Sequence, residues 1–305
     1  MNVNRLAVSA IVRAPAKLNL FFEVLAKRGD GFHEIETLMV PVSLYDTLVA
    51  MSDPSGSVRV NCRWASPHLA ASLGPLPPSD TNLAAKAVTL LRARAGVRAG
   101  LSLELVKRIP TQAGLGGGSS DAAAALLAAN SLWNLDWSRE SLAMLGAELG
   151  SDVPFFLSEV PKRGYPAAVC RGRGELVTML AAMMPLDFVV VHPPQGLATA
   201  LVYGGCQVPR KPRSVGPLVA ALQRGETQQL GRWIHNRLEG AAEPLSPWVK
   251  RLQQAFAGED CLAAQMSGSG SSYFGICRHA RHARRVARRL QSRGVGQVYA
   301  VSTSN

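Results

Sequence analysis

A glycine-rich loop that leads directly into an alanine-rich segment constrains this sequence most. Residues 109–122 read IPTQAGLGGGSSDA, with four glycines between Pro110 and Ser119. Glycine adopts backbone angles that other residues avoid, and it lets a ligand approach the main chain closely. The following residues, to about Trp133, are apolar on nearly every helical face, which predicts a deeply buried helix. The loop therefore joins a strand to the first turn of a buried helix.

The start of that helix predicts an anion site. Unpaired backbone amides and the positive end of the helix dipole meet at Ser119, Ser120 and Asp121. A polyphosphate is the natural ligand, and the Ser119 or Ser120 hydroxyl is suited to a magnesium ion that bridges phosphates. The alternative is a loop that only turns a strand into a helix, but four glycines and two serines exceed what a turn needs.

Three well-known phosphate loops do not fit this sequence. The Walker A loop ends in a lysine followed by serine or threonine, and no lysine follows these glycines. The dinucleotide fingerprint requires glycine where Ser119 stands, and Asp136, at the spacing of its ribose-binding acid, directly follows the helix. The glycine loop of protein kinases lies in a hairpin without this helix. The loop belongs to another kind of nucleotide site.

The remaining sequence predicts an α+β protein with two lobes. Strands are expected at residues 18–25, 35–42, 47–51, 58–62, 101–106, 188–191, 273–277 and 297–301. Helices are expected from the cap candidates Asp80, Thr81 and Asn82 to about residue 95, and near Val215, Glu226 and Pro247. Proline, glycine and serine mark loops at residues 66–79, 159–166 and 204–217. Because strict β-α-β alternation is missing, we expect α+β lobes of residues 1–180 and 181–305, with the boundary between Glu175 and Leu186.

Composition places the chain among globular proteins. It has 305 residues, 47% hydrophobic and 18% charged, a size at which one core tends to divide into two. No stretch approaches the roughly 20 apolar residues of a membrane-spanning helix, and the N-terminus lacks the apolar core of a signal peptide. The five cysteines are scattered and form no C-x-x-C pair, which fits a reducing compartment. We expect a cytoplasmic protein, monomeric or homodimeric, that binds no membrane.

The net charge of +12 raises the expectation of a polyanionic partner, either nucleic acid or a phosphorylated small molecule. Much of the charge lies in residues 278–294, RHARHARRVARRLQSRG, where Ala283, Val286, Ala287 and Leu290 recur at helical spacing. One interpretation is an arginine-rich surface helix, and the other is an RNA-binding surface. The charge alone does not decide between a surface helix and an RNA-binding surface. We expect no nucleic-acid partner.

The motif P-x-x-x-G-L-G-G-G-S-S-D-A resembles the ATP-binding motif of the GHMP kinases, named for galactokinase, homoserine kinase, mevalonate kinase and phosphomevalonate kinase. Supporting segments occur in the expected order at residues 14–20 (APAKLNL), 28–33 (RGDGFH), 149–156 (LGSDVPFF) and 266–272 (MSGSGSS). The resemblance covers most of the chain. It implies the two-lobed GHMP-kinase fold, with an N-terminal lobe like a ribosomal-protein domain and a ferredoxin-like α/β C-terminal lobe.

Within that family, PAKLNL and RGDGFH are similar to the branch that acts on a cytidine diphosphate conjugate of methylerythritol. The resemblance implies ATP- and Mg²⁺-dependent phosphorylation of the 2-hydroxyl of this small-molecule substrate, in the non-mevalonate route to isoprenoid precursors. Two alternatives stay open. One is another GHMP kinase that acts on homoserine, mevalonate or a sugar, against which the Phe32-His33 pair speaks. The other is an RNA-binding protein.

Two charged residues are the catalytic candidates. Asp152 is a short acid in an apolar stretch, where its basicity is open to tuning, and its alternative role is a helix N-cap. Lys17 lies on an otherwise apolar strand, where a buried lysine is costly without an anionic partner, and its alternative is an edge-strand lysine. The resemblance implies that Lys17 and Asp152 lie together in the site. Asn19 shares the strand face of Lys17 by alternation.

The binding residues follow from the resemblance. Phe32 and His33 match residues that stack on cytosine and hydrogen-bond its edge, whereas from sequence alone they read as a core ring and a surface histidine. Gly268 and Gly270 border the methylerythritol or the transferred phosphate, or form only a turn; Asn19 completes the substrate set. Ser120 is the expected magnesium ligand. The nucleotide-binding residues are Pro110, Thr111, Gln112, Ala113, Gly114, Leu115, Gly116, Gly117, Gly118, Ser119 and Ser120.

The sequence departs from the family pattern at several places. Phe32 stands where the family often has tyrosine, which removes a phenolic hydrogen bond but keeps a ring for stacking. Arg237 stands where an aspartate is common, and residues 159–166 form a longer segment than usual. These departures affect local geometry and kinetics more than the class of reaction.

Overall fold

The computed structural model describes residues 1–6, 8–79, 81–159, 164–181 and 183–304. The chain forms two compact units from interleaved segments. The first unit consists of Met1–Ala16, Leu44–Thr111 and Gly116–Val160, and the second consists of Lys17–Ser43, Gln112–Leu115 and Pro161–Asn305. Helices and strands are mixed in both, as expected for an α+β fold.

The first unit is built on a sheet. Its strands are β1 (Val3–Arg5), β4 (Val58–Trp64), β5 (Gly100–Lys107) and the adjoining parts of β2 (Ser9–Lys27) and β3 (His33–Asp53). β1 pairs antiparallel with β2, β5 pairs antiparallel with β3, and β4 pairs parallel with β5. The inward positions of β5 alternate as predicted, since Leu101, Leu103 and Leu105 are buried.

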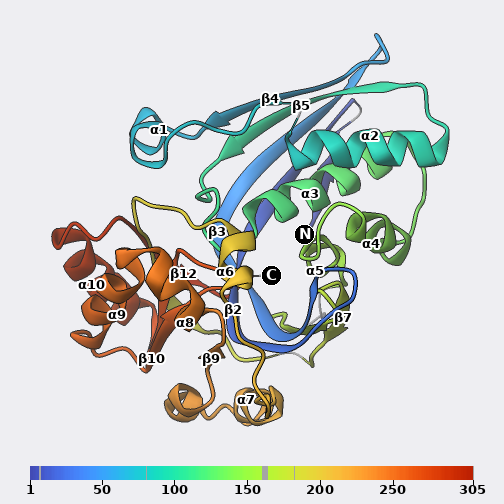
Figure 1. Ribbon diagram of the computed structural model, residues 1–305. Helices are drawn as coiled ribbons and strands as arrows, with labels where there is room; N and C mark the ends of the chain where they lie inside the picture. Colours follow the sequence, from blue (N-terminus) through green and yellow to red (C-terminus); the bar gives the residue numbers. More distant parts are fainter. Residues whose placement is uncertain (7, 80, 160–163, 182, 305) are drawn as a thin grey trace. The chain divides into compact units, whose positions relative to one another are not determined.

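The other elements of the first unit are helices. They are α1 (Pro67–Leu73), α2 (Leu83–Ala95), α3 (Gly117–Leu132), α4 (Arg139–Ala147) and α5 (Val153–Leu157). The Asn82 side chain caps α2 by accepting a hydrogen bond from the Ala84 amide at 2.9 Å, which confirms the predicted start. α2 and α3 lie side by side over the sheet (Figure 1), and α3 is buried on nearly every side, as its sequence predicts.

Two predictions of local structure in the first half are wrong. Residues 66–79 contain α1, which Ser66 caps through the Leu69 amide at 3.3 Å and which begins with Pro67. The strands expected at residues 35–42 and 47–51 are parts of the single strand β3.

The second unit contains an antiparallel sheet in the order β10-β11-β8-β12. Its strands are β8 (Asp187–His192), β10 (Ala263–Met266), β11 (Tyr273–Cys277) and β12 (Gln297–Ser302). β6 (Ala168–Arg171) pairs with β3 and with β7 (Leu176–Met179), and β9 (His235–Asn236) pairs with β2. The helices are α6 (Thr199–Gly204), α7 (Gly216–Gln223), η1 (Thr227–Arg232), α8 (Glu239–Ala242), η2 (Glu243–Leu245), α9 (Pro247–Ala257) and α10 (Ala280–Ser292).

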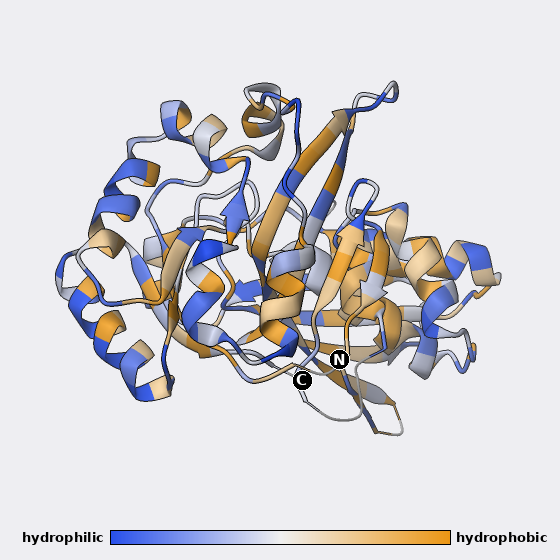
Figure 2. Cartoon of the chain, turned by 90° about the horizontal axis from the view of Figure 1, so that it is seen from below, coloured by the Kyte–Doolittle hydropathy of each residue, from blue (hydrophilic) through white to orange (hydrophobic). Residues whose placement is uncertain are grey.

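The core of the second unit lies between this sheet and α9 and α10. Val189 and Val191 of β8 meet Leu252 of α9 and Val286 and Leu290 of α10. The predicted apolar stripe of the basic helix is thereby confirmed. Figure 2 shows hydrophobic and hydrophilic residues alternating along the helices.

Some predictions fall outside these observations. The loop expected at residues 159–166 includes residues 160–163, which lie outside the described residues. The domain boundary at residue 180 stays a prediction, because the compact units interleave along the chain. Within the described ranges, no helix is both long and apolar enough to cross a membrane.

Candidate functional site

The first turn of α3 has the features of an anion site. α3 starts at Gly117, earlier than predicted, so Ser119 and Ser120 both lie in its first turn. Its N-cap, Gly116, has φ +70° and supplies no side-chain hydrogen bond to the first-turn amides. The Ser120 hydroxyl is buried and has no hydrogen-bond partner among the described residues. Uncapped amides and an unpartnered hydroxyl fit a bound phosphate and its cation.

A buried cluster of Lys107, Asp46 and Asp121 fixes the base of this turn. The Lys107 ammonium contacts the carboxyl groups of both Asp46 and Asp121, and Asp46 also accepts a hydrogen bond from the Ile109 amide at 3.0 Å. Burial, together with the charge of Asp46, raises the pKa of Asp121 to about 8, although Lys107 opposes this shift. The end of β5 is thus joined to the first turn of α3. The Lys107–Asp46–Asp121 cluster was not predicted, because its members are far apart along the chain.

A second missed feature is a pocket of about 960 Å³ in the first unit, lined mainly by β4 and α2. Val60 and Asn61 of β4 contribute to it, as do Lys86 and Thr89 of α2. The pocket lies close to the start of α3, since Leu83, one turn before Lys86, contacts that turn: a Cβ on Gly118 would lie 3.4 Å from Leu83 Cδ1. Ordinary strand and helix patterns gave no signal of this pocket.

Asp152 lies in the segment next to the same turn. A Cβ on Gly150, two residues earlier, would lie 3.7 Å from the Ser119 hydroxyl oxygen. Asp152 occupies the N-cap position of α5 but its φ of −84° and ψ of −12° are helical, and its side chain makes no capping hydrogen bond. The capping alternative is therefore not realised. The predicted catalytic acid and the start of α3 lie in the same unit.

In the second unit, Lys17, Asn19 and Gly268 come together. Lys17 is 4% exposed, and its ammonium donates to the Asn19 side-chain oxygen at 2.5 Å. The side-chain amide nitrogen of Asn19 in turn donates to the Thr37 hydroxyl at 2.8 Å. A Cβ on Gly268, where φ is +56°, would lie 3.0 Å from Asn19 Oδ1 and 3.3 Å from Lys17 Nζ. Lys17 is buried, so the edge-strand alternative fails.

Part of the predicted loop belongs with these residues. Leu115 accepts a hydrogen bond from the Lys17 amide at 2.9 Å, and Gly114 accepts one from the Ser267 hydroxyl at 3.1 Å. Gly114 has φ +70°, and a Cβ there would lie 2.1 Å from the Ser267 carbonyl oxygen, so only glycine fits. Residues 112–115 pack in the second unit and residues 116–120 in the first. The predicted pairing of Lys17 with Asp152 joins different units and stays a prediction.

The predicted cytosine-binding residues lie on the second unit beside two further side chains. Phe32 is half exposed, with the Arg173 guanidinium 4.8 Å from its ring centroid. The His33 ring lies 5.1 Å from that of Tyr203 at an interplanar angle of 32°. Burial, with a smaller effect of the Lys27 charge, lowers the pKa of His33, so its imidazole is neutral at pH 7. Sequence analysis missed Tyr203, an aromatic residue in α6 with no motif around it.

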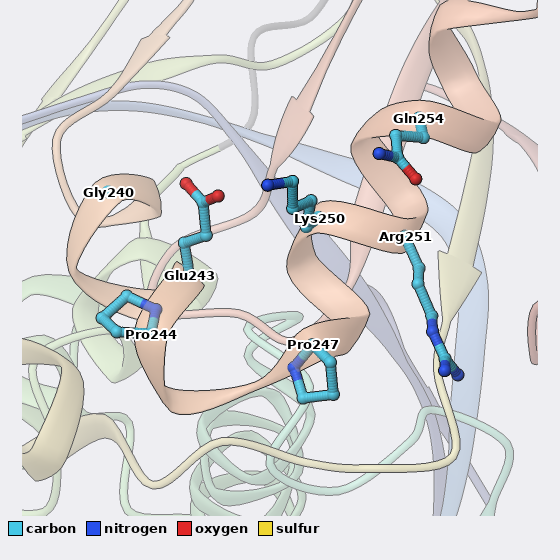
Figure 3. Close-up of a pocket in the computed structure, with 7 residues that line it drawn as sticks. All are labelled: Gly240, Glu243, Pro244, Pro247, Lys250, Arg251 and Gln254. Carbon is cyan, nitrogen blue, oxygen red and sulfur yellow. The ribbon is translucent and has the colours of Figure 1, made fainter.

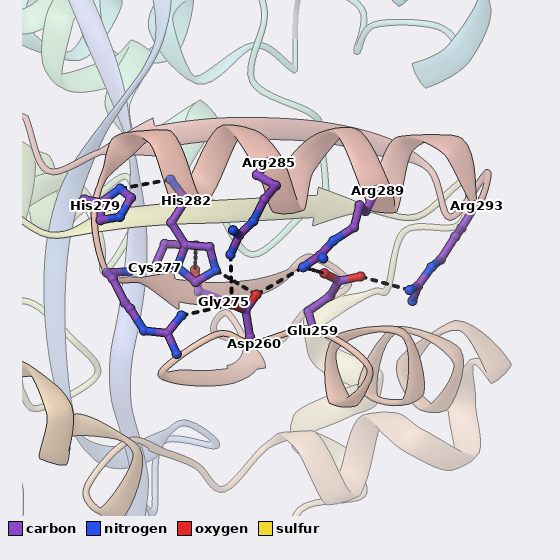
Figure 4. Close-up of polar contacts among 10 residues, drawn as sticks. Glu259, Asp260, Gly275, Cys277, His279, His282, Arg285, Arg289 and Arg293 are labelled. Atoms are coloured by element: carbon purple, nitrogen blue, oxygen red, sulfur yellow. Dashed lines mark hydrogen bonds and ion pairs between the residues drawn. The ribbon is translucent and has the colours of Figure 1, made fainter.

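Two acids of the second unit pair with part of the basic segment that contains α10. Asp260 accepts hydrogen bonds from Arg278, Arg285 and Arg289, and Glu259 forms ion pairs with Arg289 and Arg293 (Figure 4). These contacts attach the basic helix to its own unit.

A second pocket, of about 540 Å³, lies between α8, η2 and α9. The side chains of Glu243 and Lys250 point toward one another across it (Figure 3). None of its lining residues is a predicted site residue, so we assign it no function. Among the described residues, no cluster of histidine, cysteine, aspartate or glutamate is arranged to hold a metal ion.

Comparison with known proteins identifies the family. The family model for the GHMP kinases N terminal domain matches residues 82–159, and that for the GHMP kinases C terminal domain matches residues 218–296. A 4-diphosphocytidyl-2-C-methyl-D-erythritol kinase of Pelotomaculum thermopropionicum is 38% identical over 94% of each chain. One of Shouchella clausii is 37% identical over 95% of this chain and 93% of the relative.

Comparison with solved structures points to the same family. A crystal structure of 4-(cytidine 5'-diphospho)-2C-methyl-D-erythritol kinase is 35% identical, covers 97% of this chain and 100% of its own, and has a TM-score of 0.75. A homoserine kinase from Cytophaga hutchinsonii, 19% identical over 100% of this chain and 97% of its own, has a TM-score of 0.74 and shows the shared fold alone. The chain belongs to the GHMP kinase family, among its 4-diphosphocytidyl-2-C-methyl-D-erythritol kinases.

Proposed function

We propose that the chain transfers the γ-phosphoryl group of ATP to the 2-hydroxyl of 4-diphosphocytidyl-2-C-methyl-D-erythritol, in the non-mevalonate route to isoprenoid precursors. Relatives of that name, 37–38% identical over more than nine-tenths of the chain, support this substrate. The structural observation that carries the proposal is the uncapped start of α3, with the unpartnered Ser120 hydroxyl, beside the segment that bears Asp152.

The nucleotide extends from the pocket to this helix start. The pocket between β4 and α2 takes the adenine, because it combines apolar walls at Val58 and Val60 with polar groups at Asn61 and Lys86. The first-turn amides of α3 hold the phosphates, with residues 110–118 shaping the loop. The Ser120 hydroxyl would help to hold Mg²⁺, which when bound would supply neutralisation of the triphosphate charge.

Phosphoryl transfer is assigned to Lys17 and Asp152. A bond forms between the 2-hydroxyl oxygen and the γ-phosphorus as the bond from that phosphorus to the β,γ-bridging oxygen breaks, and ADP leaves. Asp152 accepts the hydroxyl proton or fixes the hydroxyl electrostatically. The Lys17 ammonium stabilises charge on the transferred group, and Asn19 orients that ammonium by accepting its hydrogen bond. Gly268 and Gly270 leave room for the acceptor.

The cytidine end is held by rings. Phe32 stacks on the base, and neutral His33 offers one donor and one acceptor to its edge. The Tyr203 ring packs beside the His33 imidazole and supports it. This arrangement selects a pyrimidine conjugate over homoserine, mevalonate or a sugar.

The decisive experiment measures ADP release from magnesium-ATP with the cytidyl substrate, homoserine and mevalonate. We expect turnover with the cytidyl substrate alone, and a fall in kcat of about 100-fold or more for Asp152→Asn. The exposed Asp136→Asn in the same unit is the control and keeps wild-type kinetics. Turnover of mevalonate but not of the cytidyl compound would overturn the substrate, and an active Asp152→Asn would remove that residue's role.

The RNA-binding alternative is not favoured, and a gel shift titrated with salt tests it, since phosphate-driven binding weakens steeply as salt rises. We further propose a cytoplasmic protein, monomeric or homodimeric. Its five free cysteines support a reducing compartment.

A further inference from the structure

One short segment of the second unit, residues 235–239, runs beside β2. β9 pairs parallel with β2, with Phe21 opposite His235 and Phe22 opposite Asn236. The next amide, that of Arg237, donates to the Phe22 carbonyl at 2.8 Å. The segment is therefore attached to the strand that carries Lys17 and Asn19.

The Asn236 side chain ties this segment to the late glycine motif. Its amide nitrogen donates to the carbonyls of both Met266 and Gly268, each at 2.8 Å. Its side-chain oxygen accepts from the Leu238 amide at 3.0 Å. A side-chain amide has two N–H donors, so both are used on one turn, and Asn236 is 8% exposed.

Glu239 holds the same turn from its other end. Its carboxylate accepts hydrogen bonds from the Met266 amide at 3.1 Å and from the Tyr273 hydroxyl at 2.9 Å. Both backbone polar groups of Met266 thus bond to one segment of the chain. The position of residues 266–268 depends on that segment.

This turn determines the surroundings of Lys17. Gly268 approaches the Lys17 ammonium and the Asn19 oxygen so closely that a Cβ would lie 3.3 Å and 3.0 Å from them. The Ser267 hydroxyl accepts from the Asn19 backbone amide at 3.3 Å and donates to the Gly114 carbonyl at 3.1 Å. A shift of the turn therefore changes the space beside the Lys17 ammonium.

An ion pair anchors the segment itself. The Arg237 guanidinium forms two hydrogen bonds with Glu23, Nε to Oε1 at 2.7 Å and Nη2 to Oε2 at 3.0 Å. The Glu23 carboxylate is fully buried and also accepts from the Arg213 amide at 2.9 Å. Burial alone raises the pKa of Glu23, but the hydrogen bonds from Arg237, Arg213 and Val24 outweigh it and lower that pKa. The departure noted at Arg237 thus has a partner on β2.

We propose that Asn236 is a positioning residue for phosphoryl transfer, which sets the Met266–Gly268 turn against Lys17, and that the Glu23–Arg237 ion pair holds Asn236 in place. The inference rests on the proposed function, because Lys17 acts on the transferred phosphoryl group only there. Asn236 touches neither reactant in this scheme. Its effect passes through the turn.

The test compares Asn236→Asp, which keeps the shape and loses both donors, with Asn130→Asp. Asn130 is a matched control, since its side chain also joins two backbone groups, both of Trp137, at 3.1 Å each. For Asn236→Asp we expect kcat to fall about 100-fold, as for a displacement of roughly 1 Å, with KM for ATP changed less than about threefold. Asn130→Asp lowers the melting temperature and leaves kcat unchanged.

Hydrogen exchange of peptides that cover residues 264–274 supplies a readout that needs no activity. We expect faster exchange there in Asn236→Asp than in wild type and no change in Asn130→Asp. Unchanged exchange and unchanged kcat would overturn the inference. A wild-type enzyme that does not turn over the cytidyl substrate would instead overturn the proposed function, and the exchange result would still stand.

A second pair of variants keeps the test open if Asn236→Asp does not fold. The Arg237 side chain is 29% exposed, so substitutions there are tolerated better. Arg237→Lys keeps the charge and loses the paired geometry, whereas Arg237→Met loses both. We expect kcat to decrease in the order wild type, Arg237→Lys, Arg237→Met. Wild-type kcat in a folded Arg237→Met would refute the anchoring role.

Discussion

The ring of Tyr203 lies beside that of His33, with centroids 5.1 Å apart, although the two residues are far apart in the sequence. The contact joins α6 to the start of β3, where Phe32 and His33 were expected to bind a cytosine ring. It gives the imidazole a fixed neighbour and adds a second aromatic ring at the proposed cytosine site.

Replacing Tyr203 by alanine is expected to weaken binding of the cytidyl substrate. Loss of the aromatic contact with His33 costs about 0.5–1.5 kcal/mol, so KM for that substrate rises by up to about tenfold while KM for ATP is unchanged. Tyr203→Phe keeps the ring and serves as the control. Steady-state kinetics with each substrate varied in turn provide the measurement. Equal effects of the two variants would show that the hydroxyl, and not the ring, matters.

Filling the pocket between β4 and α2 is expected to affect ATP alone. Thr89 lines the pocket from an exposed position on α2, so Thr89→Trp places an indole in the cavity without disturbing the core. KM for ATP rises at least about tenfold, and KM for the cytidyl substrate stays the same. Met144→Trp, at a side chain that is 66% exposed on α4 and outside the pocket, is the matched control. An unchanged KM for ATP would remove the adenine assignment.

Local sequence signals predicted much of the fold. The Asn82 cap, the alternation of β5 and the apolar stripe of α10 each use interactions within a few residues, and each is confirmed. The glycine loop also predicted a helix start, which the structure places at Gly117. The α+β class followed from the order of these elements.

The remaining features depend on contacts between distant segments. A break was expected between residues 42 and 47, but Asp46 lies inside β3, where Lys107 and the Ile109 amide satisfy its carboxylate. The composition of residues 66–79 hid the cap of α1 at Ser66. Tyr203 and the pocket residues carry no local pattern that separates them from ordinary core positions. Lys17 is the exception, since a lysine on an apolar strand already required a nearby partner.

Removing the charge of Lys17 is expected to slow phosphoryl transfer. Lys17→Met keeps the length of the side chain and loses the ammonium, so kcat falls by about 100-fold or more, the effect of losing one preorganised charge at a reacting group. Lys27→Met, an exposed lysine on the same strand, is the control and keeps wild-type kcat. Single-turnover rates separate the chemical step from product release. A Lys17→Met enzyme with wild-type single-turnover rates would contradict the assignment.

The buried Asp121 predicts a specific dependence of stability on pH. Burial and the neighbouring Asp46 raise its pKa from 3.8 to about 8 in the folded protein. The folded state therefore binds more protons than the unfolded state between about pH 4 and pH 8. The contribution of Asp121 to stability is largest below that window and decreases as pH rises through it.

Asp121→Asn removes the titrating carboxyl group and with it this pH dependence. The stability of the variant relative to wild type should thus increase from pH 5 to pH 8, by on the order of 1 kcal/mol per pH unit. Urea unfolding at several pH values measures the difference, with the exposed Asp136→Asn as the control. A difference between Asp121→Asn and wild type that stays constant over this range would mean that Asp121 is ionised in the folded protein.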